Sequence, residues 1–222
     1  MSNTSKSVID LGLIGGMFDP VHNGHINIAL SSFELLRLDE LQFLPCGKPV
    51  HKHENFASPV HRLAMLALAV SNFSKINIDS RECQSDEPSY TQRSLLAIRS
   101  ENPDSRLFFI LGQDAFNSLA TWYNWKAIFS LAHFVIAGRP DSEINFPEEL
   151  LSEFENRHVG SIEEMKQYKQ GKVLTAPIPL LDISSTMIRN NIDEGRDIQE
   201  LVPSLVAQYI YTQKLYISEG SV

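Results

Sequence analysis

The chain reads LIGGMFDPVHNGH from Leu13 to His25. The apolar run Val8–Ile14 is typical of a buried strand, and the apolar residues after His25 recur at helical spacing. This stretch therefore joins a strand to a helix through a glycine-containing loop. The first N–H groups of a helix lack intrahelical partners and lie at the positive end of its dipole. The junction is predicted to bind an anion such as a phosphate.

Individual residues of this junction have expected roles. Gly15 and Gly16 can adopt positive φ and let a ligand approach the backbone closely. Asn23 is predicted to cap the helix, and His22 and His25 stand at its start. The stretch has neither the GxGxxG spacing of dinucleotide-binding folds nor the P-loop pattern.

Other roles for the histidines remain open at this point. His22 could be a surface residue, and His25 could be a satisfied residue at the helix start. Both could also bind a metal together with His51 and His53, although their spacing fits no common zinc pattern.

Length and composition indicate one cytoplasmic domain. The 222 residues can bury a substantial core, and the two cysteines, Cys46 and Cys83, indicate no disulfide framework. Residues 1–7 are polar and no apolar run approaches about 18 residues, so neither a signal peptide nor a membrane span is expected. The net charge of −8 and the pI near 5.3 argue against a nucleic-acid or membrane surface. Neither the net charge nor the pI indicates an oligomeric state.

Strand-length apolar runs alternate with helix-period segments along the chain. Strands are predicted at Val8–Ile14, Leu41–Pro45, Lys75–Asp79, Leu107–Leu111, Phe134–Ala137 and Lys172–Ala176. Helices are predicted at Gly24–Arg37, at Pro59–Ser71 with Leu63, Leu66, Ala67 and Val70 on one face, and at Thr91–Ser100. This alternation predicts an α/β, doubly wound parallel sheet of Rossmann type, with ligands outside the carboxyl ends of the strands. Residues 141–171 are expected to form a helical excursion or a flexible insert, and a short helix after Pro203 to form a C-terminal cap.

Polar segments follow the second and third predicted strands. Residues 45–53 read PCGKPVHKH, a basic loop that could clamp a phosphate or could simply be solvated. Residues 79–91 read DSRECQSDEPSYT, and Thr91 is placed to cap the next helix.

Polar and aromatic residues also follow the fourth strand. Gly112 allows close approach, and the carboxylate of Asp114 can accept hydrogen bonds from ribose hydroxyls. Trp122 and Tyr123 come next, although aromatic pairs belong to a core more often than to a ligand site.

A second helix start lies near the other end of the chain. Residues 183–189 read ISSTMIR, in which Ser184 or Ser185 is the expected N-cap and Arg189 can reach over the first turn. A capped helix with a solvated arginine is the simpler interpretation of this segment alone.

Two motifs resemble a known superfamily. Residues 15–25 resemble the G-G-[ST]-F-D-P-x-H-x-G-H signature of the nucleotidyltransferases, and residues 183–189 resemble their I-S-S-T-x-I-R element. Met17 departs from the usual Thr or Ser, which removes a side-chain hydroxyl but keeps the backbone N–H. The loops after the second, third and fourth strands are similar to those of bacterial nicotinate mononucleotide adenylyltransferases.

The resemblance implies a site and a reaction. The expected reaction joins nicotinate mononucleotide to the adenylyl group of ATP and releases pyrophosphate, with Mg²⁺ on the triphosphate and no metal held by the protein. The implied catalytic residues are His22, His25 and Arg189. The implied ATP-binding residues are Gly15, Gly16, Met17, Phe18, His22, His25, Gly112, Asp114, Ile183, Ser184, Ser185 and Arg189. The implied mononucleotide-binding residues are Gly16, Lys52, Thr91, Asp114, Trp122 and Tyr123.

The sequence also indicates the extent of the domain and leaves alternative functions open. One nucleotidyltransferase domain is expected over residues 1–222, with a core at about 8–190 and a helical subdomain at about 191–217. The partners are the two substrates, without nucleic acid or membrane. The main alternative is a related adenylyltransferase for another phosphorylated acceptor such as phosphopantetheine. Two further alternatives are a non-catalytic nucleotide-binding regulator and, last, a hydrolase with a histidine-bound metal.

Overall fold

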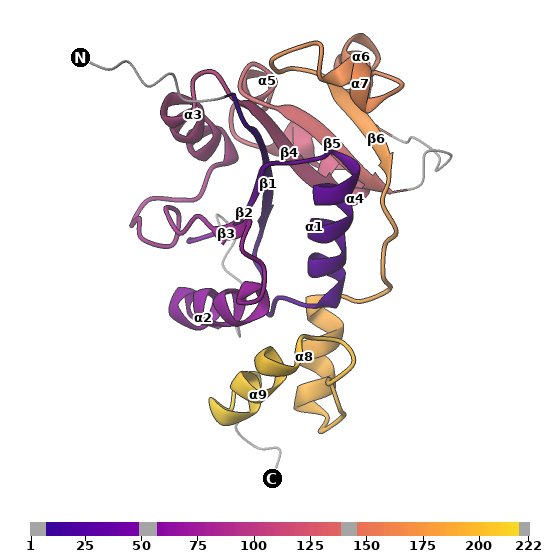
Figure 1. Ribbon diagram of the computed structural model, residues 1–222. Helices are drawn as coiled ribbons and strands as arrows, with labels where there is room; N and C mark the ends of the chain where they lie inside the picture. The colour runs from indigo at the N-terminus through magenta and orange to yellow at the C-terminus, as the bar shows by residue number, and fades with distance from the viewer. Residues whose placement is uncertain (1–7, 49–56, 139–145, 218–222) are drawn as a thin grey trace, which may run out of the picture.

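The computed structural model in Figure 1 describes residues 8–48, 57–138 and 146–217. A six-stranded sheet carries helices on both sides. The strands are β1 (Asp10–Gly16), β2 (Glu40–Pro45), β3 (Ile76–Ile78), β4 (Arg106–Gly112), β5 (His133–Gly138) and β6 (Val173–Pro177). The helices are α1 (Asn23–Leu35), α2 (Pro59–Val70), α3 (Thr91–Glu101), α4 (Gln113–Asn117), the 3₁₀ helix η1 (Leu119–Thr121), α5 (Trp125–Ile128), α6 (Glu148–Arg157), α7 (Ile162–Met165), α8 (Ser185–Asp193) and α9 (Ser204–Thr212).

All neighbouring strands pair in parallel, in the order β3-β2-β1-β4-β5-β6. The predicted doubly wound sheet is confirmed, and each predicted strand lies within two residues of an observed one at both ends. The winding reverses between β1 and β4. In such a sheet a ligand crevice forms outside the carboxyl ends of the strands at this point.

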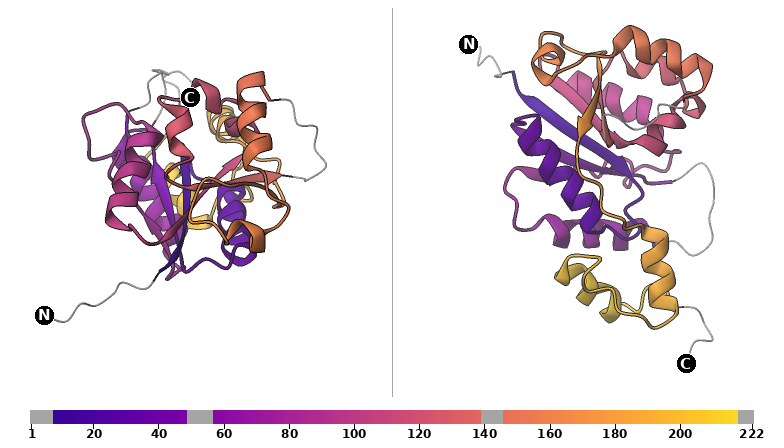
Figure 2. Two further views of the ribbon diagram at one scale, coloured as in Figure 1. Left: turned by 90° about the horizontal axis from the view of Figure 1, so that it is seen from above. Right: turned by 90° about the vertical axis from the view of Figure 1, so that its right-hand side faces the viewer.

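Alternation along each strand divides the core between the two faces of the sheet. In β4, Phe108 and Ile110 join the cluster that contains residues of α1, α2, α8 and α9. Leu107, Phe109 and Leu111 join the opposite cluster, with residues of α3, α4, α5 and α6. The view from above in Figure 2 shows helices on both sides of the sheet.

The buried face of α2 differs from the predicted one. Its buried residues are Arg62, Met65, Leu66, Ala69 and Val70. The predicted Ala67 is exposed and Leu63 is only partly buried, so the helix is rotated by about one residue from the expected face.

Two of the expected helix caps are also wrong. His22, not Asn23, is the N-cap of α1, and Tyr90 occupies that position before α3, so Thr91 is the first helical residue. The cap of α8 is confirmed, because the Ser184 side chain accepts a hydrogen bond from the backbone of Met187.

Helices α8 and α9 lie together at the lower end of the molecule in Figure 1, beyond the carboxyl end of β1. Helix α9 packs on α2, where His61 Nδ1 and Tyr209 Oη lie 2.9 Å apart. The predicted helical excursion contains α6 and α7 within its described part. None of the described helices has the length and apolar character needed to cross a bilayer.

The two edges of the sheet are short or covered. Strand β3 has three residues, and β6 ends at Pro177. The outer side of β6 is occupied where the backbone N–H of Val159 donates to the Val173 carbonyl at 3.0 Å.

Candidate active site

The two imidazoles of the glycine-containing stretch stack on each other at the start of α1. The ring centroids of His22 and His25 lie 3.7 Å apart. Burial lowers the pKa of both residues, and the neighbouring His22 lowers the pKa of His25 further, so both rings are neutral at pH 7. The backbone N–H of His22 donates to His25 Nδ1 at 3.3 Å. The proton of neutral His25 therefore lies on Nε2, which is a hydrogen-bond donor.

The close packing beneath these rings involves Phe18. This residue has φ of 52°, the positive value that was expected at Gly15 and Gly16, whereas these glycines form the end of β1. The Phe18 ring meets His25 edge-on at 5.0 Å and Phe43 at 5.2 Å. A Cβ atom on Gly16 would lie 2.9 Å from the Phe18 ring, so Gly16 is required for this packing.

Helix α8 brings the second motif to the same loop. Ser185 Oγ donates to the Pro20 carbonyl at 2.9 Å, and Arg189 Nη1 donates to the Asp19 carbonyl at 2.6 Å. A Cβ atom on Gly24 would lie 3.7 Å from the Ile183 carbonyl. The two motifs, far apart in the sequence, thus form one site next to the carboxyl end of β1.

A buried arginine ties the loops after β1 and β2 together. Arg62 of α2 is 1% exposed. Its guanidinium donates to four carbonyl groups, those of Met17 at 2.9 Å, Cys46 at 2.6 Å, Gly47 at 3.1 Å and Ala57 at 3.3 Å. The backbone on both sides of the site is therefore held by one side chain.

The loops after β2 and β3 are joined through Glu82. Its partly buried carboxylate accepts a hydrogen bond from Ser94 Oγ at 2.5 Å, and burial raises its pKa. Ser89 Oγ accepts from the backbone N–H of Gly47 at 2.9 Å. A Cβ atom on Gly47 would lie 1.9 Å from the Glu82 carbonyl, so only glycine fits there.

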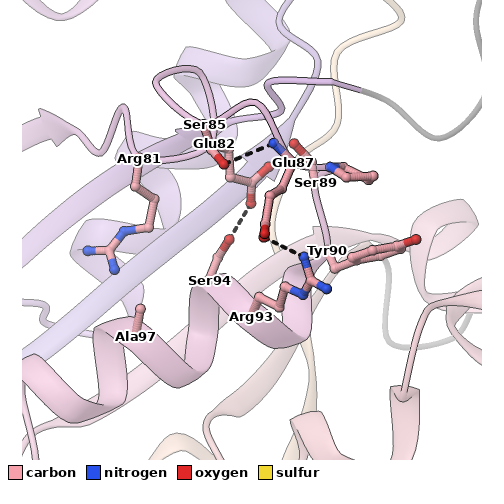
Figure 3. A pocket seen from close by; sticks show the side chains of 10 residues that line it. Arg81, Glu82, Ser85, Glu87, Ser89, Tyr90, Arg93, Ser94 and Ala97 are labelled. Atoms are coloured by element: carbon pink, nitrogen blue, oxygen red, sulfur yellow. Dashed lines mark hydrogen bonds and ion pairs between the residues drawn. The ribbon is translucent and has the colours of Figure 1, made fainter.

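A pocket of about 170 Å³ opens beside Glu82, between the loop after β3 and α3. Figure 3 shows the side chains that line it, with Glu87 paired to Arg93 at 2.7 Å and the ring of Tyr90 at one side. The Tyr90 ring also lies 4.6 Å from that of Tyr123, which links the start of α3 to the loop after β4.

The residues after β4 lie at the neighbouring strand end. Asp114 is exposed in the first turn of α4, and no atom lies within 4 Å of a Cβ placed on Gly112. Tyr123 is 54% exposed. Trp122 is partly buried with its ring edge-on to Phe109 at 6.2 Å, so it contributes to the core.

The structure brings the expected residues into two neighbouring groups. One group surrounds the start of α1 and contains Gly15, Gly16, Met17, Phe18, His22, His25, Ile183, Ser184, Ser185 and Arg189. The other lies at the start of α3 and after β4 and contains Thr91, Gly112, Asp114, Trp122 and Tyr123. Lys52, His51 and His53 lie outside the described residues. Within the described ranges, no three His, Cys, Asp or Glu side chains are grouped as metal ligands.

Sequence reasoning missed Arg62, Glu82 and Tyr216. Arg62 was hidden because its helix is mostly apolar, and an arginine within such a helix was the available signal. Glu82 lies within the quoted 79–91 segment without an assigned role, and Tyr216 donates to Asp19 Oδ1 across a separation of 197 residues.

Comparisons with known proteins show the family of this chain. The family model described as cytidylyltransferase-like matches residues 13–191. A probable nicotinate-nucleotide adenylyltransferase of Pseudoalteromonas atlantica is 39% identical over 206 residues, which cover 93% of this chain and 94% of the relative. A protein of the same name from Methylococcus capsulatus is 39% identical over 207 residues, covering 93% of this chain and 99% of the relative.

The fold also matches solved structures. One is the Plasmodium falciparum nicotinic acid mononucleotide adenylyltransferase complexed with NaAD, with a TM-score of 0.72 and 22% identity. The match covers 94% of this chain and 97% of that chain. At this level of identity the likeness concerns the fold.

Proposed function

Because this chain belongs to the cytidylyltransferase-like family, we propose that it is a nicotinate-nucleotide adenylyltransferase. It converts nicotinate mononucleotide and ATP to nicotinate adenine dinucleotide and pyrophosphate, a step of NAD biosynthesis. Residues 1–222 form one domain with a helical C-terminal subdomain, and the enzyme acts in the cytoplasm.

One observation carries the proposal. The stacked imidazoles at the start of α1 face the same loop to which Ser185 and Arg189 are bonded. Donors from two helix starts and a guanidinium thus converge where a triphosphate would meet the positive ends of α1 and α8.

The reaction needs no covalent enzyme intermediate. A 5′-phosphate oxygen of the mononucleotide attacks the α-phosphorus of ATP in line, the new P–O bond forms, and the bond to the β-phosphate breaks. Pyrophosphate leaves with the electron pair of the broken bond. Such transfers depend on positioning and on donors placed where negative charge develops.

Specific donors are assigned to the triphosphate. His25 and His22 donate to the α-phosphate and its bridging oxygen, with catalysis depending on both. Ser185 and Arg189 hold the β- and γ-phosphates, supported by the backbone of Gly15–Phe18 and by Ile183 and Ser184. A bound polyanion raises the pKa values of the imidazoles, which burial lowers in the free protein.

The second group of residues is assigned to the nucleosides. Asp114 binds ribose hydroxyls beside Gly112, while Thr91, Tyr123 and Trp122 surround the pyridine. Gly16 and Lys52 complete the mononucleotide site. The exposure of Asp114 and Tyr123 supports this assignment, because both side chains are accessible to a ligand.

ATP is used as its magnesium complex. Mg²⁺ prefers oxygen ligands and retains several waters, so phosphate oxygens can hold it without a set of protein carboxylates.

In the direct test, the protein is incubated with ATP, Mg²⁺ and one phosphorylated acceptor per reaction. The products are identified by mass. Nicotinate mononucleotide is expected to give nicotinate adenine dinucleotide and pyrophosphate. Product formation from phosphopantetheine alone, or no product from any acceptor, would contradict the proposal.

Selectivity for the acid over the amide mononucleotide is expected. A site that supplies donors to a carboxylate leaves polar groups mispaired when an amide replaces it, which penalises the amide in kcat/KM. Measuring kcat/KM for both acceptors checks this, and equal values would overturn the preference for nicotinate.

Replacing Gly24 with alanine is expected to lower kcat/KM for ATP by about tenfold or more. The new Cβ would lie 2.9 Å from His22 Nδ1, so the imidazole must move. Steady-state kinetics measure the loss, and Gly160→Ala is the matched control because no atom lies within 4 Å of a Cβ at that position. Equal kinetics for the two variants would show that the position of His22 is unimportant.

A further inference from the structure

We propose that Tyr216 is a positioning residue of the site, acting through the carboxylate of Asp19. The inference rests on the proposed function and extends it to a residue that lies beyond α9. Asp19 and Tyr216 together are called the latch.

The latch joins the segment after α9 to the loop that carries the histidines. Tyr216 Oη donates to Asp19 Oδ1 at 2.6 Å. The same oxygen accepts from the backbone N–H of Ala57 at 3.1 Å, and the Asp19 side chain is almost fully buried. A buried carboxylate that lacks donors is costly, so the phenol stabilises the observed position of Asp19.

Asp19 is also the residue to which Arg189 is bonded. Its backbone carbonyl accepts from Arg189 Nη1 at 2.6 Å, while its side chain is held by Tyr216. A shift of Asp19 therefore moves the anchor of Arg189 and the backbone that leads into His22. One hydrogen bond from a distant segment thus affects both sides of the triphosphate site.

The carboxylate depends strongly on this donor. Within the described part of the chain, Asp19 Oδ2 is buried without a hydrogen-bond partner, so the two donors to Oδ1 supply the hydrogen bonds of the whole group. The positive charges of Arg189 and Arg62 also favour the ionised carboxylate, which burial disfavours. Loss of the phenol leaves one hydrogen bond on a buried acidic group.

The backbone around Tyr216 is folded to reach Asp19. Lys214 and Tyr216 have φ of 51° and 65°, values that non-glycine residues rarely adopt. The backbone N–H of Leu215 donates to the Ile210 carbonyl at 3.1 Å, which turns the chain back after α9. Such conformations persist where surrounding contacts hold them, and the latch supplies one of these contacts.

The chain offers a matched control for the test. Tyr209 of α9 forms its own hydroxyl contact, 2.9 Å from His61 Nδ1 of α2. Tyr209→Phe and Tyr216→Phe each remove one hydroxyl that anchors the same C-terminal region. Of these two tyrosines, Tyr216 is the one bonded to Asp19, in the loop that leads to His22. If Tyr216 had only a structural role, both variants would show the same phenotype.

Steady-state kinetics with ATP and nicotinate mononucleotide, together with thermal unfolding, compare the two variants. Tyr216→Phe is expected to lower kcat by about tenfold or more, because misplaced phosphate donors act on the chemical step. Tyr209→Phe is expected to retain kcat within about twofold at a similar shift in Tm. Equal kcat values for the two variants would overturn the proposal.

A double-mutant cycle tests the route through Asp19. Asp19→Asn alone is expected to lower kcat, and adding Tyr216→Phe is expected to cause little further loss, since the two residues act as one unit. Full additivity would overturn the latch.

Hydrogen exchange separates failure of the latch from failure of the proposed function. The backbone amides of residues 21–25 are expected to exchange faster in Tyr216→Phe than in Tyr209→Phe, whatever the substrate. Faster exchange in Tyr216→Phe, together with a wild-type protein that makes no dinucleotide, would reject the function and retain the positioning role. Unchanged exchange in an active enzyme would reject the latch alone.

Discussion

Replacing His25 with alanine is expected to lower kcat by roughly 10²–10³-fold, equivalent to about 2.7–4 kcal/mol of lost transition-state stabilisation. The Nε2–H of neutral His25 is a preorganised donor, since Nδ1 is occupied by the backbone N–H of His22. In the variant, water would replace the ring and would have to be oriented during the reaction. The imidazole of the wild type is already oriented before the reaction. Single-turnover measurements with saturating ATP isolate this effect on the chemical step.

His158→Ala is the matched control for this prediction. His158 follows α6 and packs on Phe154, with ring centroids 4.8 Å apart, away from the start of α1. It should retain wild-type kcat. An unchanged kcat in His25→Ala, with circular dichroism matching the wild type, would refute the catalytic role of His25.

Replacing Arg62 with methionine is expected to lower the free energy of unfolding by at least about 3 kcal/mol. The side chain donates to four carbonyl groups from three loop segments, and methionine cannot replace these bonds. Several buried acceptors are then left without donors. Urea denaturation followed by far-UV circular dichroism measures the change.

Arg196→Met provides the comparison for Arg62. Arg196 forms an exposed ion pair with Glu194, and such pairs contribute about 1 kcal/mol or less. Its unfolding free energy should therefore stay close to that of the wild type. Similar small losses in both variants would show that the Arg62 carbonyl contacts contribute little.

The fold could be predicted because local pattern and global topology agree. Strands buried on both faces read as continuous apolar runs, and helices between them force parallel pairing. The strand order, which makes β1 and β4 neighbours at the reversal of winding, is seen only in the structure. Before that, only the family resemblance placed Gly16 and Gly112 in one site.

Details set by packing across the molecule could not be predicted. The positive φ lies at Phe18 because its ring packs on Gly16 and Phe43, whereas composition alone favours glycine for this conformation. Helix α2 offers two apolar stripes about 100° apart, and periodicity cannot tell which one faces the core. The observed stripe contains Arg62, whose partners are carbonyl groups and leave no mark in the sequence.

The proximity of the two motifs was predicted from the resemblance, whereas contacts between distant segments that support them were missed. Both motifs lie together as expected, with Arg189 bonded to Asp19. The Tyr216 contact joins segments 197 residues apart, and no local pattern announces such a pair.

The edge strands of the sheet, β3 and β6, affect whether copies of this protein can associate by strand pairing. A bare strand with regularly spaced N–H and C=O groups is a template for another chain, which leads to aggregation. In the described structure β3 is too short to offer such a template. On the other side, Pro177 lacks an N–H group and Val159 already occupies the Val173 carbonyl. Among the described residues, both edge strands are therefore poor templates for a continuous intermolecular sheet.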